Sequence, residues 1–202
     1  EENEINTGLG EPYGLCMFKN QDGIQVFVND TDGRYQQWLL TEIGTSFVSS
    51  TPRIDASLER EFTVPSQPEG CVADDEQGLL FLGVEAEGVR TIDADKDAAV
   101  ELHAVANVDG IVLAADVEGM SLYKEEAEGY LIVSSQGNYS YSVYDRLPPH
   151  AYRGSFFVAD NPQTGVDGSQ ETDGLDASSF LRTELFPAGL LVVQDGYNTL
   201  PA

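Results

Sequence analysis

One short pattern recurs four times along the chain and limits the folds open to it. In each copy a polar residue is followed by a glycine and an apolar residue, at the start of a run with β-type composition. The copies are Tyr13-Gly14-Leu15, Glu69-Gly70-Cys71, Glu118-Gly119-Met120 and Asp173-Gly174-Leu175. They lie 56, 49 and 55 residues apart, and self-similarity at such a period is typical of repeat architectures. The recurrence therefore predicts a fold built from similar units, whose opening residues are candidates for one shared site.

Short β-type runs, separated by Gly, Asp and Asn, fill each repeat, and helical periodicity is almost absent. The first repeat predicts strands at 14–19, 25–29, 34–40 and 60–64, with a loop near 49–58 between the last two. The second repeat predicts strands at 70–73, 79–84, 88–93 and 100–106. The third predicts strands at 119–123, 130–135, 139–145 and 152–158, whereas the fourth has only 174–180 and 190–194.

Four strands in each unit of about 50 residues are typical of the blades of a β-propeller. A β-sandwich also contains many short strands, but it does not explain the aligned glycine motifs. We therefore predict an all-β propeller with four-stranded antiparallel blades, as a single incomplete domain with blades at about 13–64, 69–106, 116–158 and 173–202. Three and a half blades leave an open ring with uncovered edges, so we expect the remaining blades to come from a missing segment or from a partner.

The chain is strongly acidic, with 35 Asp and Glu residues against 10 Lys and Arg residues, and its formal net charge is −25. A field of this sign repels nucleic acids and anionic membranes, so neither is expected as a partner. No apolar run approaches the roughly 20 residues needed to cross a bilayer, which predicts a soluble chain. The acidic excess has two interpretations that composition leaves open: a solubility device, or the binding of divalent cations.

The two cysteines, Cys16 and Cys71, lie in apolar β-type runs of different repeats. They could pair, but a free cysteine also packs well in a core as a small apolar side chain. We therefore expect two buried free thiols rather than a disulfide, and cysteine usage leaves the cellular compartment open.

The inner strands of a propeller line its central channel, so the polar residues that open the repeats should converge near the axis. This predicts a ring of oxygen ligands formed by Tyr13, Glu69, Asp116, Glu118 and Asp173. Asp116 and Glu118 are two residues apart in a β-like run, so both carboxylates should leave the same face of a strand. A second ring is predicted from the ends of the second strands, at Glu85, Gln136 and Asp195. Crowded carboxylates repel one another unless cations neutralise them, and an oxygen-rich donor set favours Ca²⁺ over Zn²⁺.

Longer motifs around these positions occur in order across nearly the whole chain. They are Glu11-Pro12-Tyr13-Gly14-Leu15, Pro65-Ser66-Gln67-Pro68-Glu69-Gly70-Cys71-Val72-Ala73-Asp74-Asp75-Glu76, Ala115-Asp116-Val117-Glu118-Gly119, Ser134-Ser135-Gln136-Gly137-Asn138, Tyr144-Asp145-Arg146, Thr172-Asp173-Gly174-Leu175-Asp176 and Gln194-Asp195-Gly196-Tyr197-Asn198. Together they resemble the β-propeller phytases. The resemblance implies a six-bladed, secreted or periplasmic, Ca²⁺-dependent phosphatase that acts on inositol hexakisphosphate, of which this chain would cover the C-terminal part.

The resemblance also implies roles for individual residues. Ligands of several active-site calcium ions would be Tyr13, Glu69, Glu85, Asp116, Glu118, Gln136 and Asp173. Asp167, Asp195 and Asn198 would bind stabilising calcium near the last blade. Glu69 and Glu118 would serve catalysis by holding the water that a bound calcium activates, which needs no covalent protein nucleophile. Tyr13 would also contact substrate phosphate.

Two departures from the family pattern bear on activity. Where family members carry a phosphate-contacting Lys, this chain has Thr31, and Arg34 is the nearby cation that could take its place. The N-terminal blades, with further phosphate-binding residues, have no counterpart in the chain. We therefore expect weak or absent hydrolysis by the isolated chain. Two alternatives stay open, a non-catalytic Ca²⁺-stabilised binding module of a larger or tandem-domain protein and a different propeller hydrolase such as a lactonase.

Overall fold

The structure, a computed structural model, describes residues 4–46 and 49–196 and is built from β-strands. The first sheet consists of β1 (Pro12–Asn20), β2 (Gly23–Asp30), β3 (Arg34–Ser46) and β4 (Ser49–Thr63). The second sheet consists of β5 (Pro68–Asp74), β6 (Leu79–Val84), β7 (Gly88–Asp93) and β8 (His103–Asn107). In both sheets the strands pair antiparallel in chain order.

The third sheet has the same topology and the fourth has two strands. The third consists of β9 (Val117–Glu125), β10 (Glu128–Ser135), β11 (Ser140–Asp145) and β12 (Tyr152–Phe156), with a 3₁₀ turn, η1 (Gln136–Asn138), after β10. The fourth consists of β13 (Leu175–Ser178) and β14 (Leu190–Val193). The predicted all-β architecture of four-stranded antiparallel sheets is therefore confirmed. No helix within residues 4–46 or 49–196 is long and apolar enough to cross a membrane.

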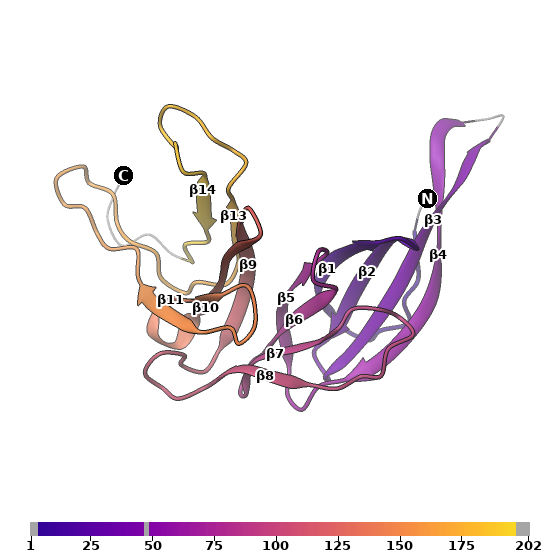
Figure 1. Cartoon of the computed structure of the whole chain (residues 1–202), viewed down its shortest axis with the longest axis horizontal. Helices are drawn as coiled ribbons and strands as arrows, with labels where there is room; N and C mark the ends of the chain where they lie inside the picture. The colour runs from indigo at the N-terminus through magenta and orange to yellow at the C-terminus, as the bar shows by residue number, and fades with distance from the viewer. Residues whose placement is uncertain (1–3, 47–48, 197–202) are drawn as a thin grey trace.

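The sheets stack side by side in an arc, with the first strand of each sheet on the inside (Figure 1). β1 contacts β5, β5 contacts β9, and β9 contacts β13. This is the arrangement of propeller blades around an axis, and it places the four glycine motifs on neighbouring strands. The long β3–β4 hairpin projects away from the rest of the first sheet (Figure 1).

The prediction of a loop near residues 49–58 is wrong, because β4 begins at Ser49 and pairs with the extended β3. Thr41 lies opposite Asp55, and Glu42 lies opposite Ile54. Ile43 and Ile54 are both largely exposed in this extension. A hairpin that faces water on both sides lacks the alternation by which strands are recognised in a sequence.

Apolar cores fill the two spaces between the first three sheets. The core between the first and second sheets is formed by Phe18, Phe27, Tyr35, Phe62, Val64, Cys71, Leu80, Leu82, Val84, Ile92 and Ala94. The core between the second and third sheets is formed by Phe81, Val89, Leu113, Val117, Met120, Leu122, Leu131, Val133 and Tyr144. β6 supplies residues to both cores because a central blade is covered on both faces, which explains its continuous apolar sequence.

A disulfide joins Cys16 of β1 to Cys71 of β5, with a Cα–Cα distance of 5.7 Å. The expectation of two free thiols is therefore wrong. Propeller packing places the first strands of neighbouring sheets next to each other, so residues 55 positions apart in sequence lie within bonding distance. The sequence did not reveal this pairing because the two cysteines stand at different offsets from Gly14 and Gly70.

A buried ion network joins the second and third sheets. Arg146, which follows β11 and is fully buried, donates through Nε and Nη2 to the carboxylate of Asp74 at 2.5 and 2.7 Å. Nη2 also donates to Oε2 of Glu76 at 2.7 Å. Lys124 Nζ lies 3.8 Å from Asp74 and 3.6 Å from Glu76. Burial raises the pKa of Asp74, but the hydrogen bonds and charge of Arg146, with the charge of Lys124, outweigh it and hold that pKa below its usual value.

Each complete sheet carries a β-bulge where its first strand begins. Register along β1 shifts between Pro12 and Leu15, so that Tyr13 and Gly14 together lie opposite Asn29. In the second sheet the pair Glu69-Gly70 lies opposite Gly83. In the third sheet the pair Glu118-Gly119 lies opposite Ser134. A bulge redirects side chains relative to a regular strand, and here it acts on the polar residue before each glycine.

The glycines of these bulges let neighbouring first strands approach closely. A Cβ on Gly70 would lie 2.8 Å from Cα of Gly119, and one on Gly119 would lie 2.6 Å from the carbonyl oxygen of Asp173. At this point Gly119 N also donates to the Asp173 carbonyl at 3.0 Å. The glycines therefore recur because a side chain at these positions would push adjacent blades apart.

Removal of the disulfide tests the contact between the first two sheets. The double variant Cys16→Ser/Cys71→Ser should lose up to about 4 kcal/mol of stability, because the bond closes a 55-residue loop in the unfolded chain and so lowers the entropy of the unfolded state. Urea unfolding followed by circular dichroism measures the loss. Dithiothreitol should destabilise the parent chain and leave the double variant unchanged; a parent chain indifferent to dithiothreitol would contradict the disulfide.

Removal of Arg146 tests the ion network. The contribution of this network to stability should depend on pH. Arg146→Met should cost about 3–5 kcal/mol at pH 7, because the buried Asp74 carboxylate loses both hydrogen bonds from the guanidinium and keeps only the more distant charge of Lys124. The pKa of Asp74 is lowered in the folded parent chain, so its contribution is present above the unfolded value and is lost as pH falls through the folded value. Urea midpoints should therefore differ most at pH 7 and least near pH 3. A constant difference across this range would contradict this role of Asp74.

Alanine substitutions test the close approach of the first strands. Gly119→Ala should destabilise the chain by about 1–3 kcal/mol, because its Cβ would overlap the Asp173 carbonyl. Gly174→Ala is the matched control, since the nearest atom to its Cβ is the side-chain oxygen of Gln194 at 3.8 Å. Thermal unfolding of the two variants compares them directly. Equal melting temperatures would mean that the Gly119 contact relaxes at no cost.

Candidate functional site

The four glycine motifs line one shallow groove of about 290 Å³ on the inner side of the arc. Tyr13, Glu69, Glu118 and Asp173 lie along it, one from each sheet. This is the convergence that the repeat pattern predicts. It arises because each bulge sits at the same end of a first strand and the first strands are neighbours.

Glu69 occupies the most enclosed position of the group and is almost fully buried. Its Oε1 accepts a hydrogen bond from Gln67 Nε2 at 2.6 Å. Its Oε2 is buried and accepts no hydrogen bond. Burial raises the pKa of Glu69, while the hydrogen bond from Gln67 opposes that rise. A buried carboxylate oxygen without a donor is costly, so this atom lacks the positive partner that its position calls for.

Glu118 and Tyr13 experience the same accumulation of negative charge. Burial, followed by repulsion from Glu69 and Asp173, raises the pKa of Glu118 to about 8. The charge of Glu69, followed by burial and the charge of Glu118, raises the pKa of Tyr13. The four groups therefore act electrostatically as one anionic cluster, although they come from four different sheets.

Glu85 and Asp116 form a second, adjacent pair. Burial raises the pKa of Glu85, and the neighbouring Asp116 raises it further, with a smaller contribution from Glu69. The prediction that Asp116 and Glu118 leave one face of a strand is wrong, because β9 begins at Val117 and Asp116 has a φ of +50°. Strand alternation therefore does not extend to Asp116, which pairs with Glu85 while Glu118 faces Glu69.

Two glutamine side chains hold Asp173 in place. Gln136 Nε2 donates to Oδ1 of Asp173, and Gln194 Nε2 donates to Oδ2 at 2.9 Å. Gln194 also accepts a hydrogen bond from Gly174 N at 3.0 Å through its Oε1. Gln136 thus lies beside the anionic cluster and contacts it through Asp173.

The remaining predicted residues are not brought into this cluster. Asp195 accepts a hydrogen bond from Gln170 N at 3.1 Å, and Asp167, in the segment before Gly168, is not among the residues that line the groove. Asn198 lies outside the described residues. Arg34 is paired with Asp30 at 3.0 Å and with Asp32 at 3.1 Å. Its guanidinium is thus already neutralised by two carboxylates.

Two polar side chains that the sequence analysis did not identify connect neighbouring sheets by hydrogen bonds. Asn29 accepts a hydrogen bond from Gly14 N at 2.7 Å and donates to the Glu69 carbonyl at 2.9 Å, so it spans the first two sheets. Ser134 contacts the Thr172 hydroxyl at 2.8 Å and spans the third sheet and the segment before β13. Both residues lie opposite a bulge, and their position at the end of the second strand is the signal that could have identified them.

The donor set suits a hard divalent cation. It consists of carboxylate, phenol and amide oxygens, with no His or Cys side chain in the groove free to bind a metal. The buried Oε2 of Glu69, which accepts no hydrogen bond, is the groove atom at which a cation would be most favoured. In the described part of the chain, however, no three Asp, Glu, His or Cys side chains stand close enough together to hold an ion as they are. Ion binding would therefore require the carboxylates to move toward one another.

Comparison with known proteins agrees with the order of these motifs. The family model described as Phytase matches residues 1–201. The 3-phytase of Bacillus subtilis (strain 168) is 33% identical over 197 residues, which are 96% of this chain and 50% of that protein. The chain thus spans about half the length of the relative it matches.

Solved structures share the architecture at low sequence identity. "Structure of U3-55K" aligns with a TM-score of 0.54 and 13% identity, over 97% of this chain and 55% of that one. "Crystal structure of RRP9 WD40 repeats" aligns with a TM-score of 0.53 and 14% identity, over 95% and 53%. These two similarities establish the propeller fold alone. The match over residues 1–201 settles the relationship: the chain belongs to the phytase family.

Proposed function

We propose that the groove belongs to a Ca²⁺-dependent phosphomonoester hydrolase that acts on inositol hexakisphosphate and that functions weakly or not at all as this chain alone. The observation that carries the proposal is the anionic cluster of Glu69, Glu118, Asp173 and Tyr13, in which Glu69 Oε2 is buried without a partner. Membership of the phytase family supports the reaction class. The half-length match to the 3-phytase supports the expectation of low activity.

The residues of the groove and its neighbours would have three roles, which are to bind cations, to orient water and to bind phosphate. Glu69, Glu85, Asp116, Glu118, Asp173 and Tyr13 would hold the ions, with Gln136 as a neutral ligand or as the support of Asp173. When bound, calcium ions would neutralise substrate phosphates and lower the pKa of water. Glu69 and Glu118 would accept hydrogen bonds from that water and orient it, and the Tyr13 hydroxyl would donate to a phosphate oxygen. Both cysteines form a disulfide with each other, so neither provides a thiol nucleophile.

Calcium also reconciles the charge of the chain with a polyanionic substrate. At a formal net charge of −25 the bare protein repels phosphate, and Arg34 is already paired with Asp30 and Asp32. Several divalent cations held between carboxylates and phosphates would reverse the local field. We further propose a secreted or periplasmic location, because the Cys16–Cys71 disulfide is stable in oxidising compartments.

A second candidate is a non-catalytic Ca²⁺-stabilised binding module of a larger or tandem-domain protein. The chain spans half of its 3-phytase relative, and this observation favours it. In that case the groove would bind calcium and the phosphate compound without turnover. Binding and hydrolysis therefore have to be measured separately.

Calcium titration tests the site independently of catalysis. Isothermal titration of the chain with CaCl₂ should give binding that Glu69→Gln and Glu118→Gln each weaken at least about tenfold, or about 1.4 kcal/mol, because each removes a ligand charge. Glu184→Gln is the control, since Glu184 is an exposed carboxylate outside the groove. Equal calcium affinities of the parent chain and the three variants would contradict the assignment of the anionic cluster as the calcium site.

Phosphate release from inositol hexakisphosphate then separates the two candidate functions. The chain in Ca²⁺ should release phosphate slowly, and chelation with EDTA should abolish the release. Calcium and substrate binding without any release supports the binding module. Release as fast as that of a full-length relative would show that this chain is a complete catalyst, contrary to the proposal.

A further inference from the structure

At the groove, one side chain bridges the main chains of the first and second sheets. Asn29 lies in β2, opposite the bulge that carries Tyr13 and Gly14, and it is fully buried. Its Oδ1 accepts a hydrogen bond from Gly14 N at 2.7 Å, and its Nδ2 donates to the Glu69 carbonyl at 2.9 Å. The Asn29 amide therefore stands between two main chains, one next to Tyr13 and the other at Glu69 itself.

The other junctions along the groove are built differently. Between the third and fourth sheets, Gly119 N donates directly to the Asp173 carbonyl at 3.0 Å. The position equivalent to Asn29, opposite the bulge of its own sheet, is Gly83 in the second sheet and Ser134 in the third. Neither of these residues carries an amide side chain. In the described part of the chain, an amide between two main chains of the groove thus occurs at the junction of the first and second sheets alone.

A contact with the core fixes the orientation of the Asn29 amide. Nδ2 also donates to the hydroxyl oxygen of Tyr35 at 3.1 Å. Tyr35 is fully buried, and its ring stacks on that of Phe62 with the centroids 5.1 Å apart. A reversed amide would place its oxygen against the Glu69 carbonyl and its NH₂ group against the Gly14 N–H, and both contacts are repulsive. The bridge therefore has one favourable orientation.

Glu69 is held at both of its ends. Asn29 donates to its main-chain carbonyl, and Gln67 donates to Oε1 of its carboxylate at 2.6 Å. The second carboxylate oxygen, Oε2, is buried and accepts no hydrogen bond. Hydrogen bonds that orient the ligands of a metal are part of its site, and the loss of one typically lowers metal affinity about 10- to 100-fold.

We propose that Asn29 is a positioning residue of the groove. Its amide sets the separation of the main chains at Tyr13 and Glu69, so that the phenol and the carboxylate bind one cation together. The closer approach that ion binding requires then comes from rotation of these two side chains and not from movement of β1 against β5. This inference rests on the proposed function, because that function supplies the cation.

Terbium(III) luminescence tests the proposal, because terbium is a hard cation that shares the preference of Ca²⁺ for oxygen ligands. A tyrosine near bound terbium transfers excitation energy to it, with an efficiency that falls steeply with distance. Calcium should displace the ion, and Tyr13→Phe should remove most of the tyrosine-excited emission. Asn29→Leu should weaken terbium binding at least about tenfold and lower the tyrosine-excited emission of the saturated protein.

Two further variants separate positioning from a general loss of stability. Gln37→Leu is the matched control, because Gln37 is a fully buried amide of the first sheet whose Nε2 donates to the Ala94 carbonyl, just after β7, at 2.8 Å. Gln37 does not line the groove, so its loss should lower stability and leave terbium affinity and emission unchanged. Asn29→Ser is too short to bridge both main chains and should reproduce the effect of Asn29→Leu at a lower cost to folding.

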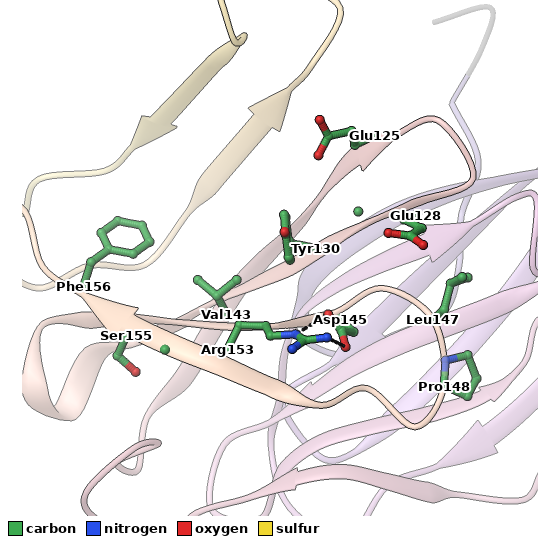
Figure 2. A pocket seen from close by; sticks show the side chains of 12 residues that line it. Glu125, Glu128, Tyr130, Val143, Asp145, Leu147, Pro148, Arg153, Ser155 and Phe156 are labelled. Carbon is green, nitrogen blue, oxygen red and sulfur yellow. Dashed lines mark hydrogen bonds and ion pairs between the residues drawn. The ribbon is translucent and has the colours of Figure 1, made fainter.

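A tyrosine beside carboxylates outside the groove provides the control for the location of the ion. Glu125, Glu128 and Tyr130 line a pocket of about 580 Å³ on the third sheet, and Figure 2 shows the three around one end of it. If terbium binds at the groove, Tyr130→Phe leaves the tyrosine-excited emission largely intact. Emission that depends on Tyr130 and not on Tyr13 would overturn the proposal.

The carboxylate variants distinguish failure of this inference from failure of the proposed function. Glu69→Gln and Glu118→Gln should both weaken terbium binding. If they do so while Asn29→Leu and Asn29→Ser behave like Gln37→Leu, the positioning role of Asn29 is wrong and the cation site stands. If neither carboxylate variant weakens binding, the cation site is wrong, and the role of Asn29 is wrong with it.

Discussion

The close approach of neighbouring first strands at their glycines is the constraint on which the rest of the structure depends. Gly70 meets Gly119, and Gly119 meets the Asp173 carbonyl, at distances that leave no room for a side chain. Because the backbones come this close, the residues before the glycines are drawn into one groove. The same contact therefore defines the spacing of the blades and concentrates negative charge at their inner edge.

That concentration of charge is opposed by covalent and ionic links farther along the same strands. The Cys16–Cys71 disulfide ties β1 to β5, and Arg146 ties the end of β5 to the third sheet through Asp74. These links lie outside the anionic cluster, so the blades can remain together while Glu69 and Glu118 repel each other. The anionic cluster is thus held together by contacts that lie outside it.

The sequence by itself determined the repeat, the strand order and the residues of the anionic cluster, because glycine spacing and β-type runs are local signals. It also carried the family resemblance, since Tyr13, Glu69 and Glu118 stand in conspicuous motifs. Tertiary structure alone decided the Cys16–Cys71 disulfide, the pairing of Asp116 with Glu85 and the network around Arg146. These depend on which strands become neighbours and on a φ of +50° at Asp116, and local sequence periodicity predicts neither property.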